Sequence, residues 1–118
     1  MTHAIRHAAL ASLFVFISAP ASLAASMLTA ANGMTLYTFD NDKGGQSACY
    51  DQCAVNWPPY LVMGGEKMDK DWTEVDRKDG TKQWAYDGKP VYFFKGDAAA
   101  GDAKGDGVKG VWHIVKED

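Results

Sequence analysis

Short segments of alternating apolar and polar residues, separated by two-residue turn signals, make up most of the chain. Asn32-Gly33 separates SMLTAA from MTLYTF, Asp79-Gly80 separates WTEVDRK from TKQWAY, and Asp87-Gly88 separates TKQWAY from KPVYFF. Asn-Gly and Asp-Gly are favoured centres of type I′ hairpin turns, in which both central residues have positive φ. Since Val, Thr, Tyr, Trp and Phe flank these signals, the pattern predicts antiparallel hairpins. A last strand is predicted at residues 111–115.

Two segments do not follow this pattern. Residues 47–56, SACYDQCAVN, lack alternation and open with a serine that suits a helix N-cap, so they predict a short helix or helical turn. The helix must end at Trp57-Pro58-Pro59, because proline cannot continue it. Residues 98–110 contain four glycines and predict a long surface loop. The predicted fold class is therefore all-β, mainly antiparallel hairpins, with one short helical turn.

The chain repeats itself at an offset of 55 residues without a gap. The offset places Ala30 on Ala85, Gly33 on Gly88, Tyr37 on Tyr92, Phe39 on Phe94, Asp42 on Asp97 and Trp57 on Trp112. Tyr, Phe and Trp are rare residues, so their agreement at one offset indicates two copies of a unit. Each copy has a hairpin turn, a YxF strand, an aspartate at the strand exit and a later tryptophan. We predict two pseudo-symmetric repeats, about 26–60 and 81–118, that pack into one small domain.

The motif YTFDND and its second copy YFFKGD resemble the Yx(F/W/Y)xxD motif of a bacterial secreted-repeat, or predicted lipoprotein, family. The segments ACYDQCAVNWPP, DGTKQWAYDGKPVYFF and GDGVKGVWHIV are similar to that family too, so the resemblance covers nearly the whole mature chain. It implies a secreted or envelope-attached protein whose biochemical role is unassigned. Many members carry a lipidated cysteine after the signal, whereas this chain has Ala25, so lipid attachment is not expected.

The amino terminus has the layout of a secretory signal peptide: a short basic head with Arg6, an apolar run over residues 8–17, and small residues before a cut near Ala24. The apolar run is shorter than the roughly 20 residues of a membrane span. We expect residues 1–24 to be removed, and residues 25–118 to form one domain in the periplasm or outside the cell.

The mature chain has a mildly acidic, mixed charge. It contains 11 Lys and Arg against 15 Asp and Glu, a net charge of −4. Nucleic-acid binding needs a basic patch, so this class of partner is not expected. A soluble monomer that binds an unknown envelope or extracellular ligand is the prediction.

Cys49 and Cys53 are the only cysteines. An even count in an exported chain favours a disulfide, and residues four apart on a helix lie about 6 Å apart, within reach of a bridge. The alternative is a periplasmic redox or copper-handling site, because two thiolates with a thioether suit Cu(I). Met63, Met68 and His113 are the possible additional ligands.

The acidic cluster after Phe39 partly matches a calcium-binding loop. Counting from Asp40, three of the five EF-hand positions fit, but a strand precedes the loop where an EF-hand has a helix. Asp40 also aligns with Lys95, and only Asp42 keeps its partner, Asp97. We therefore expect no metal, and we expect each repeated aspartate to accept hydrogen bonds from the loop that leaves its strand. A calcium-stabilised adhesion module is a second alternative.

The aromatic residues of the repeat form two ladders, Tyr37 with Phe39 and Tyr92 with Phe94, because residues two apart on a strand face the same way. The residues on the opposite faces, Leu36, Val91 and Phe93, are also apolar, so strands covered on both sides are predicted. The alternative is an aromatic platform for a sugar, a peptide or a small planar ligand. Outside the repeat, Trp72, Trp84, Tyr50 and Tyr60 are the better candidates for an exposed face.

Catalytic residues are scarce in the mature chain, which has one histidine, His113, and two serines, Ser26 and Ser47. No nucleophile, base and orienting acid can be assembled from them. The sequence therefore predicts a binding or scaffolding protein of the cell envelope that is not an enzyme and uses no cofactor.

Overall fold

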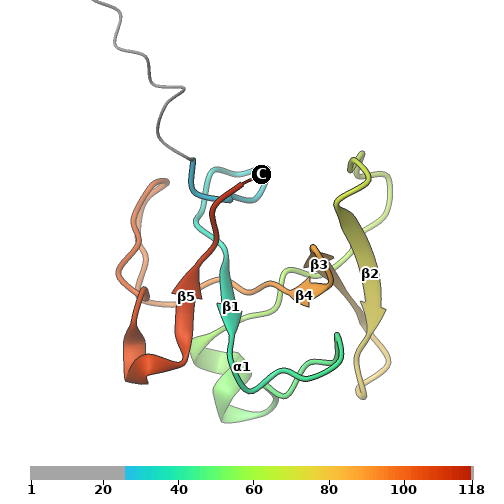
Figure 1. The fold of residues 1–118 in the computed structure, drawn as a ribbon, viewed down its shortest axis with the longest axis horizontal. Helices are drawn as coiled ribbons and strands as arrows, with labels where there is room; N and C mark the ends of the chain where they lie inside the picture. The colour runs from blue at the N-terminus through green and yellow to red at the C-terminus, as the bar shows by residue number, and fades with distance from the viewer. Residues whose placement is uncertain (1–25, 118) are drawn as a thin grey trace, which may run out of the picture.

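The computed structural model describes residues 26–117 (Figure 1). Its elements are, in chain order, β1 (Tyr37–Phe39), α1 (Gln52–Asn56), β2 (Trp72–Asp76), β3 (Lys82–Tyr86), β4 (Lys89–Pro90), the 3-10 turn η2 (Val108–Gly110) and β5 (Trp112–Ile114). β1 pairs antiparallel with β5, and β2, β3 and β4 form a second antiparallel sheet in that order. The predicted fold class is confirmed. The predicted signal peptide and its cleavage site at Ala24 lie outside the described residues.

The three turn signals adopt different geometries. Asp87 and Gly88 have φ angles of 51° and 81° and join β3 to β4 through a two-residue turn. At Asp79-Gly80 only the glycine has positive φ, and the Arg77 N–H donates to the Thr81 carbonyl across a longer loop between β2 and β3. Asn32-Gly33 likewise has positive φ only at the glycine. The type I′ prediction is therefore confirmed at Asp87-Gly88 and wrong at the other two, where hydrogen bonds close wider turns.

The helix is shorter than predicted. α1 begins at Gln52 instead of after Ser47, because Asp51 has a positive φ of 54° that breaks the helical backbone. The hydroxyl of Ser47 does not cap a helix; it lies 2.6 Å from the hydroxyl of Tyr92. The carboxyl end is as predicted, since α1 stops at Asn56, just before Trp57-Pro58-Pro59.

Two hydrophobic clusters lie on opposite sides of the central strands. Leu36 and Val91, both fully buried, belong to one cluster, while Tyr37 and Tyr92, also fully buried, belong to the other. The prediction of strands covered on both faces is confirmed. Trp84, expected on an exposed face, is in contrast buried in the Leu36 cluster, and Trp72 and Tyr60 pack against it. Trp84 is buried because Leu28, Leu36 and Val91 share this cluster with it, whereas Trp72 and Tyr60 are only partly buried.

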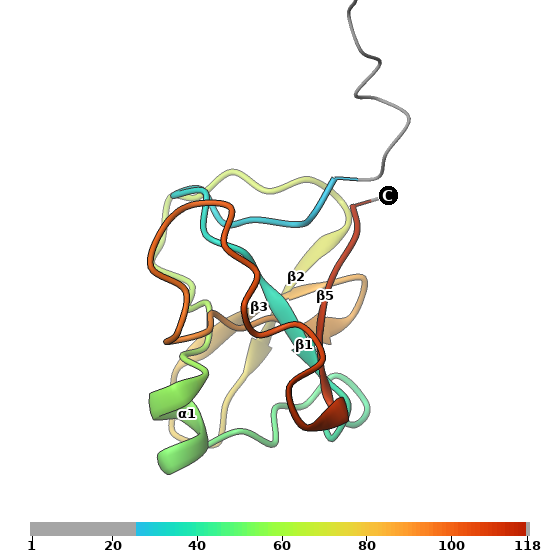
Figure 2. The same cartoon turned by 90° about the vertical axis from the view of Figure 1, so that its left-hand side faces the viewer.

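The two repeats meet at Tyr37 and Tyr92. The Tyr37 N–H donates to the Tyr92 carbonyl at 2.8 Å, and the Tyr92 N–H donates to the Tyr37 carbonyl at 2.9 Å. This reciprocal antiparallel bridge relates the two YxF segments by a local two-fold axis. α1 of the first repeat and η2 of the second lie at the same end of the molecule, beside β1 and β5 (Figures 1 and 2).

Candidate functional site

The motif tyrosine of each repeat donates a hydrogen bond to the motif aspartate of the other repeat. The Tyr37 hydroxyl lies 2.6 Å from Asp97 Oδ2, and the Tyr92 hydroxyl lies 2.7 Å from Asp42 Oδ2. Burial raises the pKa of both tyrosine hydroxyls well above their usual range, so both keep the proton that they donate. The YxFxxD motif thus makes a matched pair of bonds that lock the repeats together.

The second oxygen of each aspartate holds its own exit loop. Asp42 Oδ1 accepts from the Ala48 N–H at 2.7 Å, and Asp97 Oδ1 accepts from the Lys104 N–H at 2.9 Å. These are the loop bonds predicted from the sequence. The bond to the tyrosine of the other repeat was missed, although the repeat kept Tyr and Asp together, because the sequence alone does not show how the two copies face each other.

The surroundings of the two pairs differ. Ser47 lies beside the Tyr92 hydroxyl and accepts from the buried guanidinium of Arg77, which also donates to Gln83 Oε1 at 2.8 Å. Burial raises the pKa of Asp42, although its hydrogen bonds from Tyr92 and Ala48 oppose the shift. At the Tyr37–Asp97 pair, the Gly105 backbone N–H donates to the tyrosine hydroxyl at 3.1 Å instead.

Four aromatic rings of the repeat stack in one row across the two-fold axis. Phe39 stacks on Trp112 at 4.1 Å between ring centroids, Trp112 on Trp57 at 3.8 Å, and Trp57 on Phe94 at 4.3 Å. Each tryptophan lies between its counterpart and the phenylalanine of the other repeat. A Cβ on Gly105 would lie only 2.8 Å from the Trp57 ring, so the stack requires glycine there. All eight motif residues therefore build the junction between the repeats.

Cys49 and Cys53 form a disulfide with a Cα–Cα distance of 5.2 Å, which confirms the predicted bridge. Cys49 is fully buried against the aromatic cluster, and Cys53, on α1, is partly exposed. The bridge closes the segment that leads from Ser47 into α1.

A groove of about 460 Å³ opens along the aromatic row between α1 and η2. Phe39, Trp57, Phe94 and Trp112 contribute to its floor. Asn41, Gln52 and Asn56 come from the first repeat, and Val108, Lys109 and Val111 come from the second. The offset of 55 places Cys53 on Val108 and Asn56 on Val111, so the groove lies on the two-fold axis. Its polar residues fall outside the repeat pattern, and sequence reasoning missed them.

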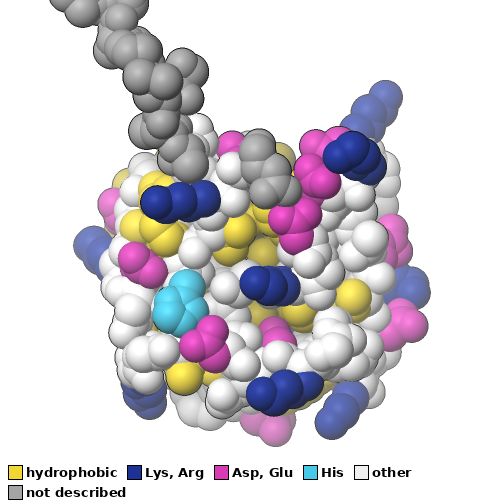
Figure 3. All heavy atoms as spheres, viewed as in Figure 1, with side chains coloured by type: hydrophobic (Ala, Val, Ile, Leu, Met, Phe, Trp, Pro, Cys, Tyr) yellow, Lys and Arg dark blue, Asp and Glu magenta, His cyan; other side chains and the backbone are white. Residues whose placement is uncertain are grey.

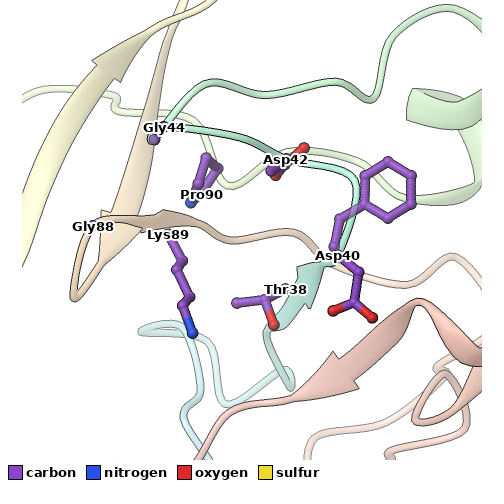
Figure 4. A pocket seen from close by; sticks show the side chains of 9 residues that line it. Thr38, Asp40, Asp42, Gly44, Gly88, Lys89 and Pro90 are labelled. Atoms are coloured by element: carbon purple, nitrogen blue, oxygen red, sulfur yellow. The ribbon is translucent and has the colours of Figure 1, made fainter.

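Two further pockets, of about 270 and 380 Å³, lie beside β4 and share Thr38, Asp40 and Lys89. In Figure 4 the carboxylates of Asp40 and Asp42 lie apart and face different parts of the smaller pocket. Asp40 Oδ2 instead lies 2.9 Å from His113 Nε2 on the neighbouring strand. Figure 3 shows acidic and basic side chains mixed over this face. Both pockets therefore carry groups of both charges.

No group of three or more His, Cys, Asp or Glu side chains within residues 26–117 is placed to hold a metal ion. No helix among the same residues has the length and apolar character of a membrane span.

The family model of Lipoprotein_15, a secreted repeat of unknown function, matches residues 25–60 and again residues 73–116. The second match begins at residue 73, within β2, and includes β3. Together the matches cover more than half of the chain, so the chain belongs to this family of secreted repeats and contains two copies of its unit. No curated protein and no solved structure is significantly similar to it.

Proposed function

Since the chain is a member of a family of secreted repeats, we propose that it is a binding protein of the cell envelope or the extracellular space and not an enzyme. The motif residues support this proposal, because they are used to join the repeats. The carboxylates of Asp42 and Asp97 are engaged by tyrosines and loop N–H groups, which leaves them no role as general acid or base.

The groove on the two-fold axis is the observation that carries the binding proposal. Its volume of about 460 Å³ lies within the range of about 300–1,000 Å³ that is usual for small-molecule sites. It combines apolar and aromatic residues with a few polar groups, the composition typical of such sites. Since both repeats contribute to it, the site exists only when the repeats are paired.

The alternative functions have less support. A Cu(I) site would need the thiolates of Cys49 and Cys53, and both sulfurs are in the disulfide. A calcium site after β1 would need Asp40 and Asp42 together, and these two carboxylates have different partners, His113 and Tyr92. Neither alternative accounts for the groove.

Tryptophan fluorescence tests the proposal, because Trp57 and Trp112 line the groove. The exported protein is screened against a library of small metabolites, sugars and peptides. We expect at least one compound to shift the emission of the wild-type protein. A library that leaves the emission unchanged would contradict the proposal and indicate a purely structural aromatic row.

Two variants on α1 locate the binding. Asn56→Phe fills the groove, and Val55→Phe adds the same ring on a neighbouring residue that is 53% exposed and outside the groove. Binding should be lost in the first variant and kept in the second, with unchanged melting curves for both. Equal binding to both variants would place the ligand elsewhere.

A further inference from the structure

The aromatic row leaves no indole face free for a ligand. Trp112 is nearly parallel to Phe39, at 7°, and to Trp57, at 2°, and Trp57 is stacked in turn on Phe94. Both faces of each indole are therefore occupied, and the two tryptophans are only 6% and 3% exposed. The edge of an aromatic ring carries the positive part of its quadrupole. A planar aromatic ligand has no free indole face to stack on, whereas an electronegative oxygen is favoured at the edges.

Three side-chain amides line the groove. Asn41, Gln52 and Asn56 are exposed, and no hydrogen bond within residues 26–117 engages their side chains. A carboxamide offers both a donor N–H₂ and an acceptor oxygen. Three such groups beside an apolar floor match a ligand with several hydroxyl groups and an apolar C–H surface. A sugar ring has this combination.

The groove also has a single charge. Lys109 is the only ionisable side chain among its lining residues, whereas the two pockets beside β4 contain Asp40 together with lysines. An ammonium group with no acidic side chain among the lining residues of the groove favours an anion there.

Lys109 has an unusual backbone conformation for its residue type. Its φ of 54° lies in the left-handed region, which L side chains rarely adopt. It stands at the middle of η2, next to Gly110, and lines the groove together with the amides. The charge of the groove is therefore carried by a tight turn.

We propose that the groove binds a sugar that carries a carboxylate, such as a uronic acid. This inference rests on the proposed function of the groove as a binding site. The carboxylate pairs with Lys109, the hydroxyls bond to Asn41, Gln52 and Asn56, and the C–H groups contact Phe39, Phe94 and the two valines. A free sugar acid and a unit of an acidic polysaccharide share this chemistry.

Titration followed by ¹⁵N-labelled backbone resonances and tryptophan emission tests this proposal at low salt. The probes are glucuronate, its uncharged methyl ester, glucose, benzoate and a short oligogalacturonate. Glucuronate should bind at least tenfold more tightly than the ester or glucose, with shifts centred on α1 and η2. Tighter binding of the oligogalacturonate would identify the polysaccharide as the source, and equal binding would identify the free sugar acid.

Lys109→Gln is the critical variant. It should reduce glucuronate binding to the level of the ester and leave ester binding unchanged, and Lys78→Gln, at an exposed lysine outside the groove, should change neither. Equal affinity for glucuronate and the ester, or tighter binding of benzoate, would overturn the sugar-acid proposal. If Asn56→Phe abolished the binding of the ester or of benzoate, the groove would still be a binding site. Failure of every compound of the wider screen would overturn the proposed function as well.

Discussion

The two tyrosine–aspartate pairs have the same geometry but different support. Tyr37 and Asp97 are joined at 2.6 Å, and the tyrosine hydroxyl also accepts from one backbone N–H, that of Gly105. Tyr92 and Asp42 are joined at 2.7 Å beside Ser47 and the Arg77 guanidinium, which belong to a buried network of side chains. The comparison suggests that the motif itself supplies the junction, and that each repeat satisfies the remaining polar groups in its own way.

Loss of the Arg77 side chain should have the largest effect on the free energy of unfolding. Arg77 supports the Tyr92 pair and not the Tyr37 pair. Arg77 is 5% exposed and donates to Ser47, to Gln83 and to the Cys49 carbonyl. Arg77→Ala leaves Gln83 Oε1 and the Cys49 carbonyl without this donor and should lower the free energy of unfolding by about 4 kcal/mol. Chemical denaturation measures the change, with Lys78→Ala as the exposed control, expected within about 0.5 kcal/mol of wild type. A loss below about 1 kcal/mol for Arg77→Ala would show that the network is not needed.

Removal of one tyrosine hydroxyl at a time tests the comparison directly. Tyr37→Phe leaves two buried groups unpaired, Asp97 Oδ2 and the Gly105 N–H, and should cost about 3 kcal/mol. Tyr92→Phe leaves Asp42 Oδ2 unpaired, but Ser47 keeps its bond from Arg77, so about 1.5 kcal/mol is expected. Denaturation curves of the two variants give the ratio of their losses in unfolding free energy. Equal losses would mean that the side-chain network does not compensate for the missing hydroxyl.

The strands and the repeat could be predicted because their signals are local. Tyr37, Phe39 and their counterparts at the offset of 55 have high strand propensity and recur together, and two-residue turn signals separate the segments. The start of α1 could not be predicted in this way. Ser47 suits a helix cap, but in the fold its hydroxyl lies among Tyr92 and Arg77, which are 45 and 30 residues away in the chain.

The groove could not be predicted because it depends on how the repeats pair. Asn56 and Lys109 lie on different repeats and carry no pattern that links them, and they share one pocket only because Trp57 stacks on Trp112. The sequence identified Phe39, Trp57, Phe94 and Trp112 as repeated aromatic residues, but it favoured a core role for them. It placed a possible exposed face at Trp84, which the second sheet buries. Long-range packing therefore decides which aromatic side chains can meet a ligand.

Removal of the disulfide should lower the free energy of unfolding by a smaller amount. It also compares α1, which a disulfide holds, with η2 at the equivalent place in the second repeat. The second repeat has Val108 at the position of Cys53, and its turn is closed without a covalent bond. The double variant Cys49→Ala with Cys53→Ala should lose about 2 kcal/mol, since the bridge closes a very short loop. Thermal melts with and without a reductant should agree with the variant, and the native protein should have no titratable thiol. A melting temperature that reductant does not change would contradict the prediction.

The smallest expected effect is a pH dependence that comes from Asp42. Burial raises the pKa of Asp42 above its ordinary value of 3.8, so between 3.8 and the raised pKa the folded state binds more protons than the unfolded state. The contribution of Asp42 to stability is therefore fully present below pH 3.8 and is lost as the pH rises through the raised pKa. Asp42→Asn should remove this component and leave a flatter curve of unfolding free energy against pH, whereas the exposed control Asp69→Asn should keep it. If the Asp42→Asn variant kept the wild-type slope above pH 3.8, the prediction would be contradicted. The half-buried environment of Asp42 would then not disfavour its ionised form, and Asp42 and Asp97 would differ only in the residues around them.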